Sequence, residues 1–233
     1  ILEKKVKPER EKLDSSRYPL LVEKWWQHSS PSVWLYEEMA ALDSVTVIPI
    51  VSKMMIPAIV SADQVLSSAL VVCPVESFGF FALISSWMHR SWAQWWGSKM
   101  RNDFRYSISD CFDTYPLCSS NRNLEKLGEE MDELQRSIAN NRDIGLTKIY
   151  NLVNAQTADG SDIDSLRRIH EKIDREVAKA YGFDIEIGEY ELAEFQGLLQ
   201  WGPPSSQRIE ILQLLLAENQ RQHDEGVIEW PTK

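Results

Sequence analysis

The sequence has few of the features that mark secreted, metal-binding or membrane proteins. Only 3 of its 233 residues are cysteines (Cys73, Cys111 and Cys118), and no two of them form a C-x-x-C pair. An odd number at this spacing argues against a disulfide scaffold and a cysteine metal site, and is typical of a reducing cytoplasm. No apolar run reaches the roughly 18 residues of a membrane helix, and no signal-peptide pattern is present. We therefore expect a cytoplasmic location.

Catalytic arrangements are missing as well. No Ser/His/Asp, Cys/His or paired-carboxylate set occurs at a useful spacing, and the 4 histidines are isolated along the chain. The sequence therefore predicts no catalytic residues and no metal ligands in this chain.

Positive charge is also scarce, with a net charge of −10. The excess of acidic over basic residues is distributed unevenly along the chain. Residues 1–120 hold 12 Lys and Arg against 13 Asp and Glu, whereas residues 121–233 hold 13 Lys and Arg against 22 Asp and Glu. A surface for nucleic acid would therefore be a local cationic patch in the first half of the chain.

The first half shows a mixed strand and helix pattern. Residues 1–17 are highly charged and contain Pro8, which suggests an extended entry segment. Short β-branched runs punctuated by Pro and Ser then predict strands within 44–53, 55–65 and 67–76. Ser77 is placed to cap a helix in which apolar residues recur at three- and four-residue steps, and Gly97 can end it. On this helix we expect His89 and Arg90 to face outward.

The second half reads as helices. Apolar residues between Leu124 and Ile138 recur at intervals of three and four residues, which predicts a helix. A short helix is predicted over Leu146–Val153, and further helices over 161–181 and from Ser205 onward. Ser161 and Asp164 resemble a capping pair, and Gly182 is a helix stop. We therefore predict an α+β fold, in which a mixed strand–helix domain (residues 1–118) is followed by an α-helical bundle (residues 119–233).

The segments VKPEREK, VIPIVSK, ADQVLSSALVV and RYSISDCFDTYP follow one another in this order along the first half of the chain. Together with segments of the second half, they resemble the MmeI-like family of restriction–modification enzymes. Near the start, VKPEREK and a later Trp-Trp pair resemble the family's entry segment, and VIPIVSK and ADQVLSSALVV resemble its strands. RYSISDCFDTYP resembles the motif that closes its target-recognition domain, and GLTKIYNLVN, LRRIHEKIDREVAKAYGF and ILQLLLAENQRQHDE resemble its helical tail. One departure is Ile50, which stands where the family commonly has arginine.

The resemblance implies a DNA target-recognition module of a bacterial or archaeal adenine-specific DNA methyltransferase or restriction–modification enzyme. Such a parent uses S-adenosylmethionine, with Mg²⁺ for any nuclease activity. This chain has neither the Asn-Pro-Pro-aromatic motif nor a Gly-rich cofactor loop, so we expect no cofactor here and no catalysis by this chain alone. It opens without an initiator methionine, and we expect it to be a segment that follows the methyltransferase domain of the same polypeptide.

Two groups of residues are candidates for contact with double-stranded DNA. Backbone contact is expected from cations and hydroxyls after the helix end, although cations there also complement the helix dipole and the hydroxyls could simply pack. Base reading is implied, by resemblance, for residues after the second strand and ahead of the next, with Lys53 suited to guanine and Gln64 to adenine. Ordinary solvated turns explain this second group equally well. The backbone set is Lys99, Arg101, Arg105, Tyr106 and Ser107, and the base-reading set is Ser52, Lys53, Met54, Gln64, Ser67 and Ser68.

A second hypothesis concerns the acidic helical part. It could dock a partner subunit or mimic the charge of DNA, so that the chain would be a protein-interaction or regulatory module. The apolar residues spaced three and four apart between Leu124 and Ile138 form a coiled-coil-like stripe that supports helix pairing. Such pairing occurs within one chain more often than between chains.

Overall fold

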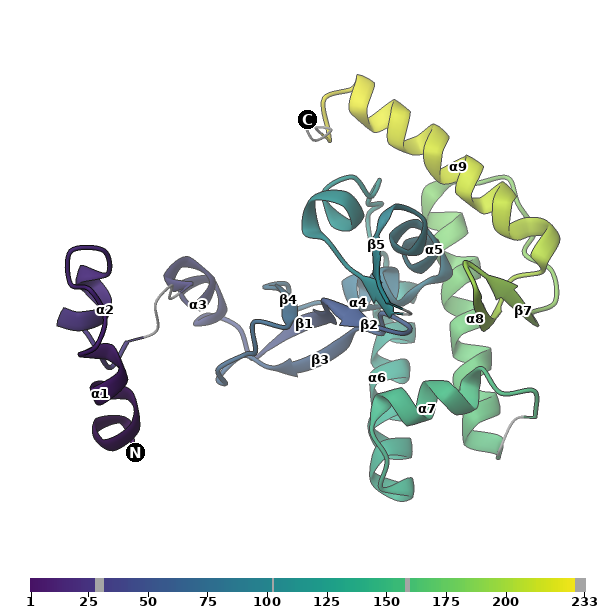
Figure 1. Ribbon diagram of the computed structural model, residues 1–233. Coiled ribbons are helices and arrows are strands. Elements are labelled where there is room, and N and C mark those ends of the chain that lie inside the picture. The colour runs from purple at the N-terminus through teal and green to yellow at the C-terminus, as the bar shows by residue number, and fades with distance from the viewer. Residues whose placement is uncertain (28–31, 102, 158–159, 229–233) are drawn as a thin grey trace. The chain divides into compact units, whose positions relative to one another are not determined.

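The computed structural model describes residues 1–27, 32–101, 103–157 and 160–228 (Figure 1). It contains two compact units, Ile1–Ala41 and Leu42–Lys233.

The first unit is helical. A π-helical turn (η1, Leu2–Val6) leads into α1 (Lys7–Arg10), and α2 (Pro19–Glu23) and α3 (Val33–Met39) follow. The expectation of an extended segment over residues 1–17 was wrong. Pro8 lies in the first turn of α1, where a missing amide donor costs no hydrogen bond, so this proline is compatible with a helix.

In the second unit, the predicted strands form an antiparallel sheet in the order β3-β1-β4. The middle strand, β1 (Ser44–Pro49), pairs with β3 (Ala58–Ser61) and with β4 (Leu70–Cys73). Its central residues, Val45 to Ile48, are all buried, which matches their β-branched and apolar character.

A second antiparallel sheet has the order β2-β6-β5. Its strands are β2 (Val51–Ser52), β5 (Ser98–Met100) and β6 (Asp103–Arg105). The sequence pattern predicted no strand after the helix end at Gly97, but β5 and β6 form a hairpin there. Because β2 follows β1 after Ile50, the two sheets are joined directly through the chain.

Two helices lie where a single one was predicted. Ser77 caps α4 (Phe78–Ser85) by accepting a hydrogen bond from the Phe80 amide. Ser86 has an extended backbone that separates the two helices, and it caps α5 (Trp87–Trp96) by accepting a hydrogen bond from the His89 amide. These helices are buried on almost every side, so the prediction that His89 and Arg90 face outward was wrong. The two side chains are only 3% and 7% exposed.

The C-terminal part contains the predicted helices and an unpredicted hairpin (Figure 1). Gly182, at φ 72°, ends α8 as expected, but Gly160, not a Ser161 capping pair, precedes it. The hairpin joins β7 and β8 across Gln196 and Gly197. The elements are η2 (Ile108–Phe112), α6 (Arg122–Arg142), α7 (Leu146–Val153), α8 (Ser161–Tyr181), β7 (Glu191–Phe195), β8 (Leu198–Gly202) and α9 (Ser205–Asp224).

The α+β prediction is confirmed, and one hydrophobic core runs across residue 118. Phe81 and Trp87 belong to the same buried cluster as Leu124, Ile173 and Ile211. Between α4 and α6 the backbones approach so closely that a Cβ atom on Gly128 would lie 2.0 Å from the carbonyl oxygen of Phe78. Residue 118 therefore marks a change in sequence pattern, from mixed strand and helix to helix. That it is also a domain boundary stays a proposal.

A buried carboxyl group also joins the two parts. Asp174 on α8 accepts hydrogen bonds from the Trp87 amide (2.6 Å) and from the Tyr190 hydroxyl, and the buried guanidinium of Arg90 is close enough to interact with it electrostatically. Burial outweighs these favourable contacts and raises the pKa of Asp174 from 3.8 to about 6.

We expect Gly128→Ala to destabilise the chain by roughly 3 kcal/mol, because the new methyl group must displace backbone and not a flexible side chain. Urea unfolding measures this loss, with the exposed neighbour Glu129→Ala as the control, for which the change should stay within about 0.5 kcal/mol. Equal stabilities of the two variants would show that α4 and α6 do not meet at Gly128.

Asp174→Asn should flatten the pH dependence of stability. Because the folded state holds this proton more tightly than the unfolded state, the contribution of Asp174 is fully present below pH 4 and is lost as the pH rises through about 6. Between pH 4 and pH 8 the wild type should therefore lose roughly 2–3 kcal/mol relative to the variant. Paired urea titrations at the two pH values test this, and a constant difference between the proteins would contradict it.

Candidate nucleic-acid interface

The β2-β6-β5 sheet has a solvent-facing side that carries one row of residues across all three strands. Val51 pairs with Arg105, and Arg105 pairs with Ser98, so the three side chains share a face. Met100 and Asp103 form the next row on the same face, because side chains alternate along a strand. All five residues are exposed. We call this surface the outer face.

The opposite side of the sheet, the inner face, packs against the body of the second unit. It carries Ser52, the buried Phe104 and Lys99, which pair across the strands; Lys99 lies at the edge of this face and is exposed. Phe104 is 2% exposed, and the Lys99 ammonium lies 5.2 Å from the centre of its ring. The same ammonium donates a hydrogen bond of 2.9 Å to the carbonyl of Gln196. Lys99 is thus on one hairpin with Arg101 and Arg105 but not on the outer face.

Two cations of the hairpin are available for a ligand. Arg105 lies on the outer face, and Arg101 is exposed at the hairpin turn with φ 61°. Within the described part of the chain, neither guanidinium has an ion-pair or hydrogen-bond partner. Both can therefore accept an external anion or a polar base edge without breaking an internal bond.

A hollow of about 590 Å³ adjoins Arg105. Ser107 and Ser109 line it, with their hydroxyl oxygens 2.9 Å apart, and Asp110 and Asp113 add two carboxylates. The surroundings of Arg105 thus offer both hydrogen-bond donors and acceptors, which suits the polar edge of a base as well as a phosphate oxygen.

Tyr106 is placed differently from the rest of the predicted backbone-contact set. It is 2% exposed, and its hydroxyl lies 2.8 Å from Nε2 of His89, whose Nδ1 donates to the carbonyl of Ile84. Burial lowers the pKa of His89 to about 4, so the ring is neutral and Nε2 accepts from Tyr106. The hydroxyl is already used inside the protein, and we leave Tyr106 out of the interface.

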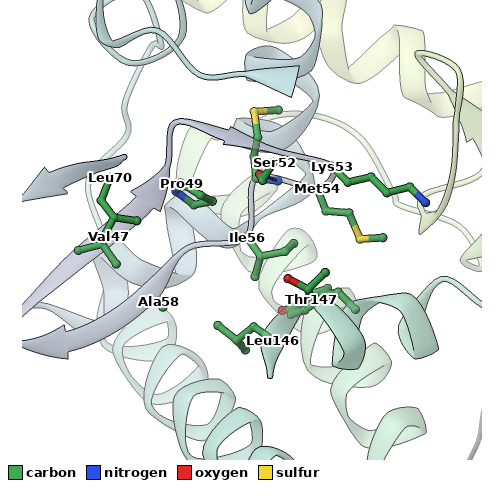
Figure 2. A pocket seen from close by; sticks show the side chains of 12 residues that line it. Val47, Pro49, Ser52, Lys53, Met54, Ile56, Ala58, Leu70, Leu146 and Thr147 are labelled. Carbon is green, nitrogen blue, oxygen red and sulfur yellow. Dashed lines mark hydrogen bonds between the residues drawn. The ribbon is translucent and has the colours of Figure 1, made fainter. Parts of the chain in front are cut away.

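Of the three candidates after β2, only Lys53 projects freely. The Ser52 hydroxyl accepts from the Met55 amide at 2.8 Å, and Met54 is buried with its sulfur 3.1 Å from Nδ2 of Asn154. Figure 2 shows this region around an apolar cavity of about 240 Å³, with the Lys53 chain extending away from Val47 and Leu70. Ser52 and Met54 therefore shape the turn that presents Lys53.

The remaining candidates lie in the exposed loop of residues 62–69 between β3 and β4. Gln64 donates to the Ser61 carbonyl at 3.1 Å, and the Ser67 hydroxyl accepts from the Ala69 amide at 3.2 Å. The loop begins beside Asp43 and ends beside Ile50, so it follows the length of β1. Ser67 and Ser68 lie toward the Ile50 end, near the second sheet, whereas Gln64 lies toward the opposite end.

Sequence reasoning missed the outer face as a unit, including Val51, Ser98, Met100 and Asp103. A partial signal was present in β6, where the exposed Asp103 and Arg105 flank the buried Phe104, but all three residues of β5 are exposed. With strands this short, and with cations on both faces, the alternation does not distinguish a hairpin from a loop.

Comparison with known proteins identifies the segment that carries the outer face. Residues 28–119 match the family model described as the target recognition domain of MmeI. Over these residues the chain resembles the MmeI target recognition domain. The segment contains both three-stranded sheets, α4 and α5, and every candidate contact residue named above. No protein with curated annotation matches the chain.

The fold extends beyond that domain. A solved structure of the type IIL restriction–modification enzyme MmeI in complex with DNA is similar over 95% of this chain, with a TM-score of 0.64 and 21% identity. The chain spans 26% of that enzyme's length. The C-terminal helices and the β7–β8 hairpin therefore belong to the shared fold together with the target recognition domain.

Other kinds of site find no support in the described residues. They contain no group of three or more His, Cys, Asp or Glu side chains that could hold a metal ion. None of their helices is long and apolar enough to cross a membrane. The three cysteines are free thiols.

We expect Tyr106→Phe to reduce stability by about 1–2 kcal/mol, because it leaves the buried Nε2 of His89 without a donor. Urea unfolding at pH 7 measures the loss. The exposed Tyr36→Phe is the matched control and should change stability by no more than about 0.5 kcal/mol. Equal curves for the two variants would mean that the Tyr106 hydroxyl is not committed to His89.

Proposed function

We propose that this chain recognises double-stranded DNA, with the outer face of the β2-β6-β5 sheet directed into the major groove. The major groove is about 12 Å wide and admits a two-stranded β-ribbon, and the β5–β6 hairpin, which carries Ser98, Met100, Asp103 and Arg105 of the outer face, is such a ribbon. The observation that carries the proposal is the solvent-facing row around Arg105, whose guanidinium has no partner among the described residues and which lies in the segment that matches a target recognition domain.

Different residues would serve backbone and base contacts. Arg101, at the turn, and Ser107 are suited to phosphates, which position a protein without reading sequence. Lys53, beside the outer face, could read guanine acceptors, and Ser67 and Ser68 lie near the same sheet. Gln64 is suited to adenine but lies farther along β1, so its contact requires the duplex to follow that strand.

The charge distribution supports this placement. The excess of acidic residues lies after residue 120, whereas the surroundings of the outer face are balanced, with Lys53, Arg101 and Arg105 against Asp103, Asp110 and Asp113. A duplex would therefore meet less repulsion at this edge of the second unit than at the outer surfaces of the acidic helices. Phosphate contacts of this kind make DNA affinity depend on salt.

We further propose that the module supplies sequence specificity to a catalytic domain elsewhere in a longer polypeptide. In this family that partner is an adenine-specific methyltransferase domain, which uses S-adenosylmethionine. The absence of an Asn-Pro-Pro-aromatic motif from these 233 residues supports a non-catalytic role. The chain's similarity to one quarter of the MmeI enzyme is consistent with this division.

The test is selection of duplexes from a randomised pool by the full chain, followed by titration of the selected duplex over a salt series. We expect a defined sequence preference and a logarithmic affinity that falls linearly with the logarithm of salt concentration. Arg101→Gln should reduce the slope of that line by about 1 and weaken all duplexes alike.

The matched control is Arg168→Gln, which removes an exposed arginine from α8, far from the proposed surface in sequence. Its affinity and salt slope should equal those of the wild type. Affinity that does not respond to salt, or equal effects of the two substitutions, would contradict the proposed surface.

A further inference from the structure

We infer that the β7–β8 hairpin positions the β2-β6-β5 sheet for DNA recognition. Lys99 is the positioning residue, because it connects the turn of this hairpin to the sheet. The inference rests on the proposed function, since it assigns a role within the same recognition surface. It also separates Lys99 from the phosphate-contacting cations with which the sequence groups it.

The first observation is the direction of Lys99. Its cross-strand partner is Phe104, which is buried, whereas the partner of the neighbouring Ser98 is Arg105 on the outer face. The Lys99 ammonium bonds to the Gln196 carbonyl and lies over the Phe104 ring. These contacts link strand β5 to the β7–β8 turn behind the sheet.

The second observation is that the hairpin which carries this turn is held by α5 and α9. Gln196 and Gly197 have φ angles of 54° and 78°, as in a two-residue hairpin turn whose twist matches its strands. Arg208 of α9 donates to the carbonyls of Ala193 (3.0 Å), Gln200 (3.2 Å) and Pro203 (2.8 Å). The side chains of Gln94 and Gln200 exchange amide hydrogen bonds in the core. A hairpin whose strands are bonded to both α5 and α9 can act as a fixed support for its turn.

A second connection joins the β7–β8 hairpin to β2, the other edge strand of the β2-β6-β5 sheet. Asn154 accepts a hydrogen bond of 2.7 Å from the Trp201 amide of β8 and directs its Nδ2 at the sulfur of Met54, just after β2. The β7–β8 hairpin is thus linked to β5 through Lys99 and to the turn after β2 through Asn154. Both edge strands of the β2-β6-β5 sheet are therefore connected to the same element of the C-terminal part.

This arrangement matters because base contacts tolerate little displacement. Recognition side chains must be held within about 0.5 Å of their working positions by a supporting layer. Phosphate contacts made by long, flexible cations tolerate more. Loss of the Lys99–Gln196 bond should therefore reduce discrimination between sequences and leave the number of phosphate contacts unchanged.

The test compares Lys99→Met with the wild type on two duplexes, the one selected from a randomised pool and one of scrambled sequence, over a salt series. Methionine keeps the apolar stem over Phe104 and removes the ammonium. We expect the affinity ratio between the two duplexes to fall about tenfold, which is the scale of one lost base contact, with an unchanged salt slope. Loss of a phosphate ligand would instead lower the slope by about 1 and weaken both duplexes equally.

A second pair of variants acts from the other side of the bond. Gly197 has φ 78°, which valine rarely adopts and asparagine tolerates, and the atom nearest to an added Cβ is Lys99 Nζ at 4.0 Å. Gly197→Val should therefore distort the turn and reproduce the reduced discrimination of Lys99→Met. Gly197→Asn should behave as the wild type. Thermal unfolding of every variant provides the measure of stability.

The outcomes separate the two proposals. A wild-type chain without any sequence preference would overturn the proposed function and, with it, this inference. A wild type that discriminates, combined with a Lys99→Met variant that has a reduced salt slope and an unchanged affinity ratio, would make Lys99 a phosphate ligand and overturn the inference alone. Lower melting temperatures with unchanged affinity ratios would make the hairpin only structural and would also overturn it.

Discussion

The register of the β2-β6-β5 sheet is the constraint on which the account of the site depends. Pairing Val51 with Arg105 and Arg105 with Ser98 fixes which side chains face solvent. A shift of one residue would turn Phe104 outward and bury Arg105, because side chains alternate along each strand. Burial of Phe104 beneath Lys99 therefore secures the exposure of Arg105.

That register is maintained by structure from the far end of the sequence. The helices α4 and α5 are buried on nearly every side, and α6, α8 and α9 supply much of the cover. Leu198 of the β7–β8 hairpin packs against both hydrophobic clusters, including the one that contains Phe104. The target recognition domain thus shares its core with the acidic helical part, which is why the whole chain and not the domain alone follows one fold.

Local patterns predicted the elements whose signals lie within a few residues. The Ser77 cap, the Gly182 stop and the long helices were found because spacing and end residues determine them. The β7–β8 hairpin was missed although Gln-Gly stands between two strand-like runs. His89 and Arg90 were misplaced because a helical stripe shows only one packed face. Arg90 donates to the carbonyl of Trp201, 111 positions away, and His89 bonds to Tyr106, which follows the helix.

The candidate site was predictable in part for the same reason. Composition directed attention to the first half of the chain, and Lys53, Arg101, Arg105 and Ser107 lie at the surface or beside the hollow. The sequence could not show that Tyr106 bonds to His89, that Met54 is buried, or that Lys99 and Arg105 lie on opposite faces. Each of these facts depends on a partner that is distant in the chain.

The most direct test of the central claim is protection of the outer face by DNA. Ser98→Cys places a thiol in the row of Arg105, and Leu216→Cys places one at an exposed position on α9. Alkylation of each variant is followed by peptide mass spectrometry with and without the selected duplex. The account predicts that DNA slows alkylation at position 98 and leaves position 216 unaffected. Equal rates with and without DNA at position 98 would contradict it.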